Sequence, residues 1–145
     1  MSILSWNCRG LGRSRTVQEL VCLVQTHRPS AIFISESRQR ESVVKGLRYR
    51  LGLNNVLVRS SDGKGGGLAL YRDDKVIVEL KKLDPHFIDV NIVFFPALSI
   101  KWRCAVSVSV PFSFSRELIL SILCAGSIGG IKRCTTWPTA AVAVV

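Results

Sequence analysis

Two polar side chains, Asn7 and Glu36, each follow a short apolar run near the start of the chain. The runs, residues 2–6 and 31–35, predict two buried strands, and the stretch between them predicts a helix. A strand–helix–strand unit of this length places its strands side by side and parallel, so both side chains should emerge at the same sheet edge. A carboxylate and a carboxamide suit Mg²⁺, which takes hard oxygen ligands and often only one or two carboxylates. The spacing therefore predicts a magnesium-dependent phosphoryl site.

The elements that must position this site follow from the hydrophobic pattern. Thr16 and Glu19 have the spacing of a capping box, and the helical stripe after them should end before Pro29. A second helix is expected over 43–51 and should stop at Gly52. Further along, short apolar runs predict strands that are antiparallel, over 56–58, 68–71, 76–80, 87–95 and 100–110, with turns at Asp62-Gly63 and Asp73-Asp74.

The order of these elements predicts an α/β domain over residues 1–123, with a mixed sheet and helices on one face. A last helix, capped by Ser113 or Ser115, should end this domain, and residues 124–145 form an apolar tail without a period that stays unassigned. Several strands are apolar on both faces and need a second covering layer. Because no segment is left to supply that layer, we expect an incomplete sandwich whose second face is exposed and apolar or is poorly covered by the C-terminal tail.

Charge and composition indicate a folded protein that binds a polyanion. The chain has 145 residues, is 48% apolar, and carries a net charge of +10. Nine Lys/Arg against three acids lie in the first fifty residues, beside the predicted site. Such a surface suits a nucleic acid, although ordinary solvated charge is the alternative interpretation. The candidate phosphate contacts are Arg9, Arg13, Arg15 and Arg38.

The cysteines and the apolar runs of the sequence indicate the cellular compartment. Five cysteines without a C-x-x-C pair, and only two histidines, do not suit a zinc site. We expect reduced thiols in an intracellular protein, nuclear or cytoplasmic and not secreted. No run resembles a signal peptide or a membrane span, so neither a membrane nor an obligate protein partner is inferred.

Three motifs carry a family resemblance: Trp6-Asn7-Cys8-Arg9-Gly10, Glu36, and Gly66-Gly67-Leu68-Ala69-Leu70. Together they resemble the endonuclease/exonuclease/phosphatase superfamily, nearest to the apurinic-type endonuclease domains of plant non-LTR (LINE-like) retrotransposons. The resemblance implies a four-layer α/β sandwich that hydrolyses DNA phosphodiesters with a divalent metal, usually Mg²⁺. It implies that Glu36 is the metal-binding glutamate and that Asn7 hydrogen-bonds neighbouring catalytic groups. This chain would be the N-terminal half of such a sandwich, with the second half missing.

The glycine-rich run Lys64–Gly67 invites a different interpretation, that of a phosphate cradle. It lacks the preceding strand and following helix of a P-loop, so we interpret it as a flexible hairpin turn. In the family that this chain resembles, the glycine pair leads into a sheet strand.

The remaining catalytic pattern of that family is absent from the sequence. Val108 stands where a catalytic tyrosine is expected, and no aspartate or histidine follows it. Asp89-Val90-Asn91 matches the family's Asp-x-Asn motif in residue types. It precedes the strand that leads to the expected tyrosine position, however, so we interpret it as an accidental match. His27 and His86 lie at a predicted helix end and strand start, where a structural or a solvated side chain is the simpler interpretation. Without an Asp-His pair no general base is available to activate water.

The sequence thus predicts a truncated, inactive remnant of a Mg²⁺-dependent DNA endonuclease. We expect it to bind Mg²⁺ weakly or not at all, and to bind DNA weakly and without sequence preference. Two alternatives stay open. The net charge of +10 supports a non-catalytic nucleic-acid-binding remnant, whereas the missing second layer and the featureless C-terminus support an unstable pseudogene product. Salt-dependent DNA binding by a folded sample favours the first alternative, and aggregation on expression favours the second.

Overall fold

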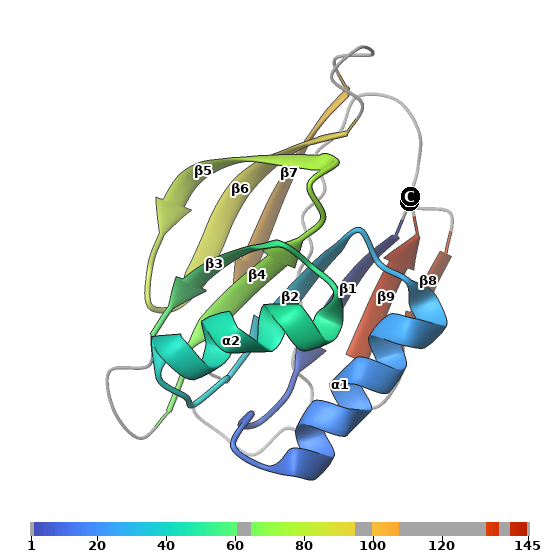
Figure 1. Cartoon of the computed structure of the whole chain (residues 1–145). Helices are drawn as coiled ribbons and strands as arrows, with labels where there is room; N and C mark the ends of the chain where they lie inside the picture. Colours follow the sequence, from blue (N-terminus) through green and yellow to red (C-terminus); the bar gives the residue numbers. More distant parts are fainter. Residues whose placement is uncertain (1, 61–64, 95–99, 108–132, 137–139, 145) are drawn as a thin grey trace.

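Two β-sheets and two helices make up the part of the chain that the structure describes. A computed structural model describes residues 2–60, 65–94, 100–107, 133–136 and 140–144. The elements are β1 (Ser2–Asn7), α1 (Ser14–His27), β2 (Ala31–Ser35), α2 (Glu41–Leu51), β3 (Asn55–Arg59), β4 (Leu68–Arg72), β5 (Val76–Leu83), β6 (Phe87–Phe94), β7 (Ile100–Ser107), β8 (Arg133–Thr136) and β9 (Ala140–Val144). The six-stranded sheet has the order β3-β4-β2-β1-β9-β8, and the three-stranded sheet has the order β5-β6-β7 (Figure 1).

The predicted strand–helix–strand unit at the start of the chain is confirmed. β1 and β2 are adjacent and parallel, with Asn7 opposite Ser35 in the register. The other strand pairs of this sheet are antiparallel, so the sheet is mixed, as predicted. The carboxyl ends of β1 and β2 therefore lie at one edge of the sheet, the lower edge in Figure 1.

The helix ends are confirmed, but the predicted capping box is wrong. α1 ends at His27 and is followed by Arg28 in the left-handed conformation, and α2 is followed by Gly52 in the same conformation. α1 begins at Ser14, so Thr16 lies inside the first turn and no side chain caps the helix. Glu19 instead pairs with Arg15 at the i,i+4 spacing that helices favour.

Both helices pack on one face of the six-stranded sheet, as predicted. The helical period places the apolar residues of each helix on a single stripe, and that stripe is buried against alternate residues of the central strands. Tyr71 of β4 is buried in this layer, and its hydroxyl donates a hydrogen bond to the carbonyl of Val44 at 2.7 Å. The layer contains Leu4, Trp6, Ile32, Ile34, Ala69 and Tyr71 of the sheet and Val17, Leu20, Val24, Val44, Leu47 and Leu51 of the helices.

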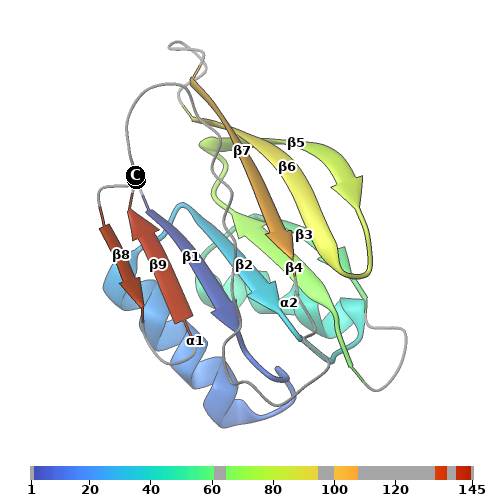
Figure 2. The ribbon, with the colours of Figure 1, turned by 180° about the vertical axis from the view of Figure 1, so that it is seen from behind.

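The second face of this sheet is covered, which corrects the expectation of an exposed apolar face. The three-stranded sheet packs over it (Figure 2) and buries Ile3, Ala31, Phe33, Leu68 and Leu70 against Val76, Ile88, Val90 and Ile92. The predicted turn at Asp73-Asp74 is present, with the Val76 N–H donating to the Asp73 carbonyl at 3.1 Å. It is no hairpin turn, because β5 pairs with β6 and begins a new sheet. The described residues thus form three of the four layers that the resemblance implies.

The apolar tail also contributes to the main sheet. β9 pairs antiparallel with β1, and β8 pairs with β9. The pattern of residues 140–144, Ala-Ala-Val-Ala-Val, is small and apolar at every position, so it shows no alternation that would predict a strand. The predicted turn at Asp62-Gly63, the last helix and the domain boundary at residue 123 lie outside the described residues. Within the described ranges, neither α1 nor α2 has the length and apolar character needed to cross a membrane.

Candidate functional site

Asn7 and Glu36 meet at the carboxyl ends of β1 and β2, as the strand pattern predicts. The Asn7 side-chain Nδ2 donates a hydrogen bond to Glu36 Oε1 at 3.2 Å. Asn7 is buried, with 5% of its surface exposed, and its Oδ1 accepts a hydrogen bond from the Arg9 backbone N–H at 3.1 Å. With both ends of the carboxamide engaged, its orientation is fixed, and the amino group rather than the oxygen faces Glu36. The roles of these residues in metal binding and catalysis stay predictions.

Arg38 completes the charged group around this carboxylate. Its Nη2 donates to Glu36 Oε2 at 2.7 Å, so each carboxylate oxygen of Glu36 accepts a bond from a different neighbour. The Arg38 side chain is 47% exposed and that of Glu36 is 22% exposed. Exposed ion pairs of this kind contribute at most about 1 kcal/mol to stability. The pair therefore matters less for folding than for the charge it presents at the surface.

The backbone at this edge is held in an unusual conformation. Arg9, Glu36 and Arg38 all have positive φ angles, of 49°, 55° and 49°. For residues with a Cβ this region costs roughly 1–2 kcal/mol each, and such outliers cluster at functional sites. Here two of them carry the side chains of the charged group itself.

Backbone hydrogen bonds between three loops hold this conformation in place. The Leu11 N–H donates to the Ser37 carbonyl at 2.9 Å, which ties the β1–α1 loop to the β2–α2 loop. The N–H groups of Ser37 and Arg38 in turn donate to the carbonyls of Gly67 and Gly66, at 3.1 and 3.0 Å. Gly66 and Gly67 have positive φ angles, of 82° and 90° respectively, which a residue without a Cβ adopts readily.

The glycine pair was the component that the sequence interpretation missed. The hairpin from β3 to β4 is confirmed, but Gly66 and Gly67 also position the loop that carries Glu36. Two consecutive glycines directly before a strand were the available signal, because such a pair often marks a special φ or a close backbone approach.

Cys8 lies beside the site, but its thiol is protonated and unreactive as a nucleophile at neutral pH. Its Sγ is 3.4 Å from the carbonyl oxygens of both Ser35 and Glu36. Burial raises the pKa of the Cys8 thiol to about 11, so the thiol stays protonated and can donate to these carbonyls. Because the thiolate is the nucleophile and the metal ligand, Cys8 has a structural role here. Cys8 and Cys22 are both free thiols.

The donor set fits a magnesium ion that shares its coordination with substrate. Among the residues that the structure describes, no group of three or more His, Cys, Asp or Glu side chains gathers to form a protein cage. Glu36 supplies one carboxylate at the surface end of the site. Mg²⁺ is commonly held by one or two carboxylates together with waters and substrate phosphates, so a single carboxylate is at the lower limit of what suffices.

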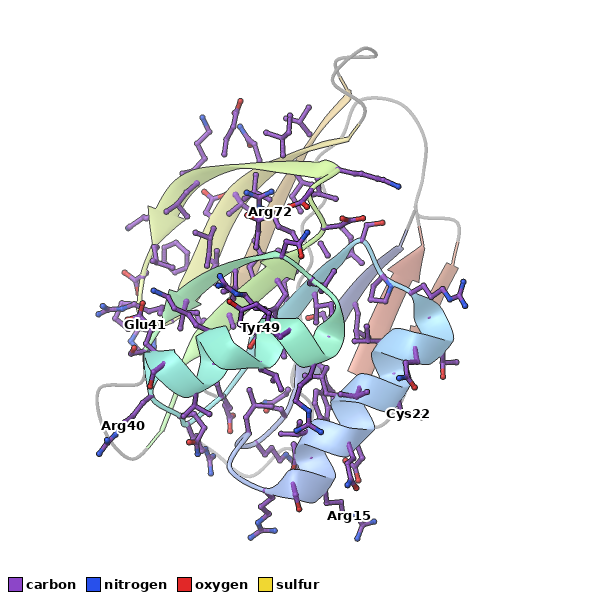
Figure 3. All side chains as sticks on the ribbon, in the orientation of Figure 1. Arg15, Cys22, Arg40, Glu41, Tyr49 and Arg72 are labelled. Atoms are coloured by element: carbon purple, nitrogen blue, oxygen red, sulfur yellow. The ribbon has the colours of Figure 1, made fainter. Side chains whose placement is uncertain are left out.

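The other predicted phosphate contacts fall into two groups. Arg9 and Arg38 belong to the loops that form the site. Arg13 directly precedes α1, and Arg15 lies in its first turn, 89% exposed and paired with Glu19 at 3.2 Å. Figure 3 shows Arg15 at the beginning of α1, at the same end of the molecule as the loops.

Asp89 and the histidines lie in other parts of the fold. Ile88, Val90 and Ile92 of β6 pack against the main sheet, so the alternate residues Asp89 and Asn91 lie on the opposite face of β6. Asn91 there donates to Glu79 of β5 at 3.4 Å. His27 ends α1, which runs away from the site, and His86 lies in the turn between β5 and β6. The placement of Asp89 supports the interpretation of Asp89-Val90-Asn91 as an accidental match.

Comparison with known proteins identifies similar folds but no similar sequence family. No protein-family model matches the chain, and no curated protein matches it. A crystal structure of D. rerio TDP2 complexed with single-strand DNA product matches with a TM-score of 0.56 and 20% identity, covering 78% of this chain and 48% of that one. A humanized D. rerio TDP2 carrying 14 mutations matches with a TM-score of 0.53 and 20% identity, covering 77% and 52%. An AP endonuclease from Archaeoglobus fulgidus gives a TM-score of 0.48 and 15% identity, covering 64% and 37%.

At this level of identity the likeness to TDP2 concerns the fold. The chain spans about half the length of the two TDP2 structures that it matches. The α/β arrangement of the described residues is therefore that of part of a larger known fold, and the predicted fold class is confirmed.

Proposed function

We propose that this chain forms the metal-binding and phosphate-binding part of a Mg²⁺-dependent DNA phosphodiesterase site, and that it binds DNA without hydrolysing it. The observation that carries this proposal is the group Asn7, Glu36 and Arg38 at the carboxyl ends of two parallel strands. The fold likeness to TDP2, whose structure was solved with a single-strand DNA product, supports it, as does the sequence resemblance to the endonuclease/exonuclease/phosphatase superfamily.

In this proposal Glu36 is the residue that holds Mg²⁺, and Asn7 is its positioning residue. A magnesium ion at Glu36 neutralises charge on a bound phosphate. The Asn7 amide donates to Oε1 and so fixes the carboxylate, while the hydrogen bond from Arg9 fixes the amide. Preorganisation of this kind lowers the cost of ordering the site when a ligand arrives.

Arg38 is the phosphate contact. A guanidinium matches the geometry of phosphate oxygens and can bind two of them at once. In the structure Arg38 pairs with Glu36, an interaction that is half exposed and therefore weak. A cation held by Glu36 would compete with Arg38 for the carboxylate and leave the guanidinium available to a phosphate, so we expect metal and DNA to bind cooperatively.

Hydrolysis is not expected, because the sequence lacks the Asp-x-Asn and Asp-His motifs that the resemblance places after Val108. The last aspartate is Asp89 and the last histidine is His86, and both precede the strand that carries the catalytic tyrosine in the resembling family. Loss of general acid–base help typically costs about 10²–10⁴-fold in rate. The missing motifs support a degenerate, truncated remnant, and the opening Trp6-Asn7-Cys8-Arg9-Gly10 supports an origin in a plant retrotransposon endonuclease.

The test is the magnesium dependence of DNA affinity, measured by fluorescence anisotropy. We expect Mg²⁺ to strengthen binding to the unmodified chain and to have no effect on Glu36→Gln. Glu41→Gln is the matched control, since Glu41 is an exposed carboxylate that pairs with Lys45 at 2.5 Å and lies just beyond the loop. Equal magnesium effects in the two variants would contradict the assignment of Glu36.

The second candidate function is metal-independent binding of nucleic acid, which the net charge of +10 favours. It predicts affinity that falls steeply with salt and does not respond to Mg²⁺ in any variant. The same titration therefore separates the two functions.

A further inference from the structure

The outer face of α2 is built differently from a plain solvated helix surface. Val44, Leu47 and Leu51 form the buried face of this helix. By the helical period, the positions opposite them carry two small residues, a lysine and a tyrosine, and all four are exposed. We call this set the α2 outer face: Ser42, Lys45, Gly46 and Tyr49.

Tyr49 stands out on this face as an aromatic ring in solvent. It is 76% exposed, whereas the other tyrosine, Tyr71, is fully buried. The guanidinium of Arg48 lies over its ring, 4.7 Å from the centroid, and donates to its hydroxyl at 2.7 Å. A ring with a guanidinium against it and most of its surface in water is suited to stack on a nucleobase.

Gly46, one turn before Tyr49, has no side chain and so exposes the helix backbone to solvent. A glycine in the middle of a helix is roughly 1 kcal/mol less favourable than alanine. Among the residues that the structure describes, no close contact explains it, because a Cβ at Gly46 would meet none of their atoms within 4 Å. The small side chains at positions 42 and 46 let a flat ligand approach the helix beside the ring.

The charge around this face is complementary to phosphate. Lys45 lies on the face, and Arg40, Arg48 and Arg50 lie beside it. The same helix carries one acidic residue, Glu41, which pairs with Lys45. The helix begins directly after the loop that carries Glu36 and Arg38, and Figure 3 shows Arg40, Glu41 and Tyr49 along it. Arg40 and Tyr49 are nine residues apart, about 14 Å at the helical rise, so the same bound strand can reach both.

We infer that the α2 outer face is a binding surface for single-stranded nucleic acid, on which Tyr49 stacks with an unpaired base and Arg50 contacts a phosphate. A strand held at Glu36 continues along α2 toward Tyr49. The inference rests on the proposed function only in taking nucleic acid as the ligand. It adds the prediction that the preferred ligand has unpaired bases beyond the part that is held at the site.

The experiment measures binding of the full chain to a fluorescent 12-nucleotide single strand and to a duplex of the same length, in EDTA. Because no divalent cation is present, the result does not depend on whether Glu36 binds metal. We expect Tyr49→Ala to weaken single-strand binding about 5- to 150-fold, the range for loss of one stacked base, and to change duplex binding less than about twofold. Tyr49→Phe keeps the ring and should bind as the unmodified chain does.

Charge is tested with a matched pair of variants. Arg50→Gln should reduce the slope of log affinity against log salt by about 0.7 for the single strand. Lys81→Gln removes an exposed charge on β5, in the three-stranded sheet that packs on the face of the main sheet opposite the helices, and should leave the slope unchanged.

Three results would overturn the inference. They are unchanged single-strand affinity in Tyr49→Ala, an equal loss in Tyr49→Phe, and an equal loss on the duplex. Polyglutamate is the probe for a rival occupant, an acidic protein. If it binds the chain and loses as much affinity in Tyr49→Ala as the single strand does, the face recognises acidic protein and the inference is wrong.

Discussion

Replacing Asn7 by aspartate would set a second carboxylate against Glu36. The amide Nδ2 lies 3.2 Å from Glu36 Oε1 at a position that is 5% exposed. In Asn7→Asp a hydrogen bond would therefore become a contact between like charges. Asn7→Ala is the matched variant, because it removes the same bonds without adding charge.

The expected cost follows from this distance. Two unit charges about 3.2 Å apart repel by about 5 kcal/mol at an effective dielectric constant of ~20. Glu36 is 22% exposed and paired with Arg38, so it can relax away from the new charge. We expect Asn7→Asp to lower the free energy of unfolding by ~2–4 kcal/mol at pH 7. The folded variant keeps a proton that the unfolded chain releases, so its stability should fall as pH rises above about 4, where the unfolded carboxyls titrate.

Magnesium distinguishes the two variants, because two facing carboxylates bind a divalent cation better than one. At a concentration about 100 times the dissociation constant, Mg²⁺ restores about 2.7 kcal/mol. Urea denaturation with and without Mg²⁺ should show this gain in Asn7→Asp and a much smaller one in Asn7→Ala. Equal stability of the two variants, with no difference in their response to Mg²⁺, would refute the assignment of Asn7 and Glu36 to one charged site.

Three further predictions concern the structure around the site. Tyr71→Phe removes a buried hydrogen bond to the Val44 carbonyl and should lower the free energy of unfolding by about 0.5–1.5 kcal/mol in urea. Gly67→Ala forces a Cβ onto a φ of 90° and should cost at least ~1–2 kcal/mol, measured the same way, with unchanged stability as the contrary result. Burial raises the pKa of Cys8 from 9.0 to about 11, so its contribution to stability should be lost as pH rises from about 9 to 11. At pH 8 a thiol reagent should modify Cys22 and spare Cys8, as mass mapping of the labelled peptides would show.

The predictable parts of the fold are those that short-range patterns determine. β2 occupies residues 31–35 as predicted, because a fully apolar run bounded by Pro29 and the polar residues after it leaves little freedom. The stop of α2 at Gly52 follows from the left-handed conformation that glycine adopts readily. The meeting of Asn7 and Glu36 follows from the handedness of strand–helix–strand units rather than from either residue alone.

The parts that could not be predicted depend on which strand pairs with which. The turn at Asp73-Asp74 has the same sequence character whether it closes a hairpin or passes the chain to a second sheet. Only tertiary packing of Val76 and its neighbours on the main sheet decides between these, and that packing covers the face expected to be bare. The pairing of β9 with β1 likewise joins segments from the two ends of the chain, which no local period reveals. The ties from Gly66 and Gly67 depend on loop conformation for the same reason.

Plasmid nicking by the purified chain in excess Mg²⁺, run beside Glu36→Ala and an authentic DNA endonuclease, tests whether the site is inactive. We expect the chain to bind the plasmid and leave it supercoiled over hours, as Glu36→Ala does, because Glu36 can hold the metal but the sequence lacks the Asp-His pair that would activate water. Metal-dependent nicking by the chain that is abolished in Glu36→Ala would contradict this. It would show that a further group of this chain supplies the missing base.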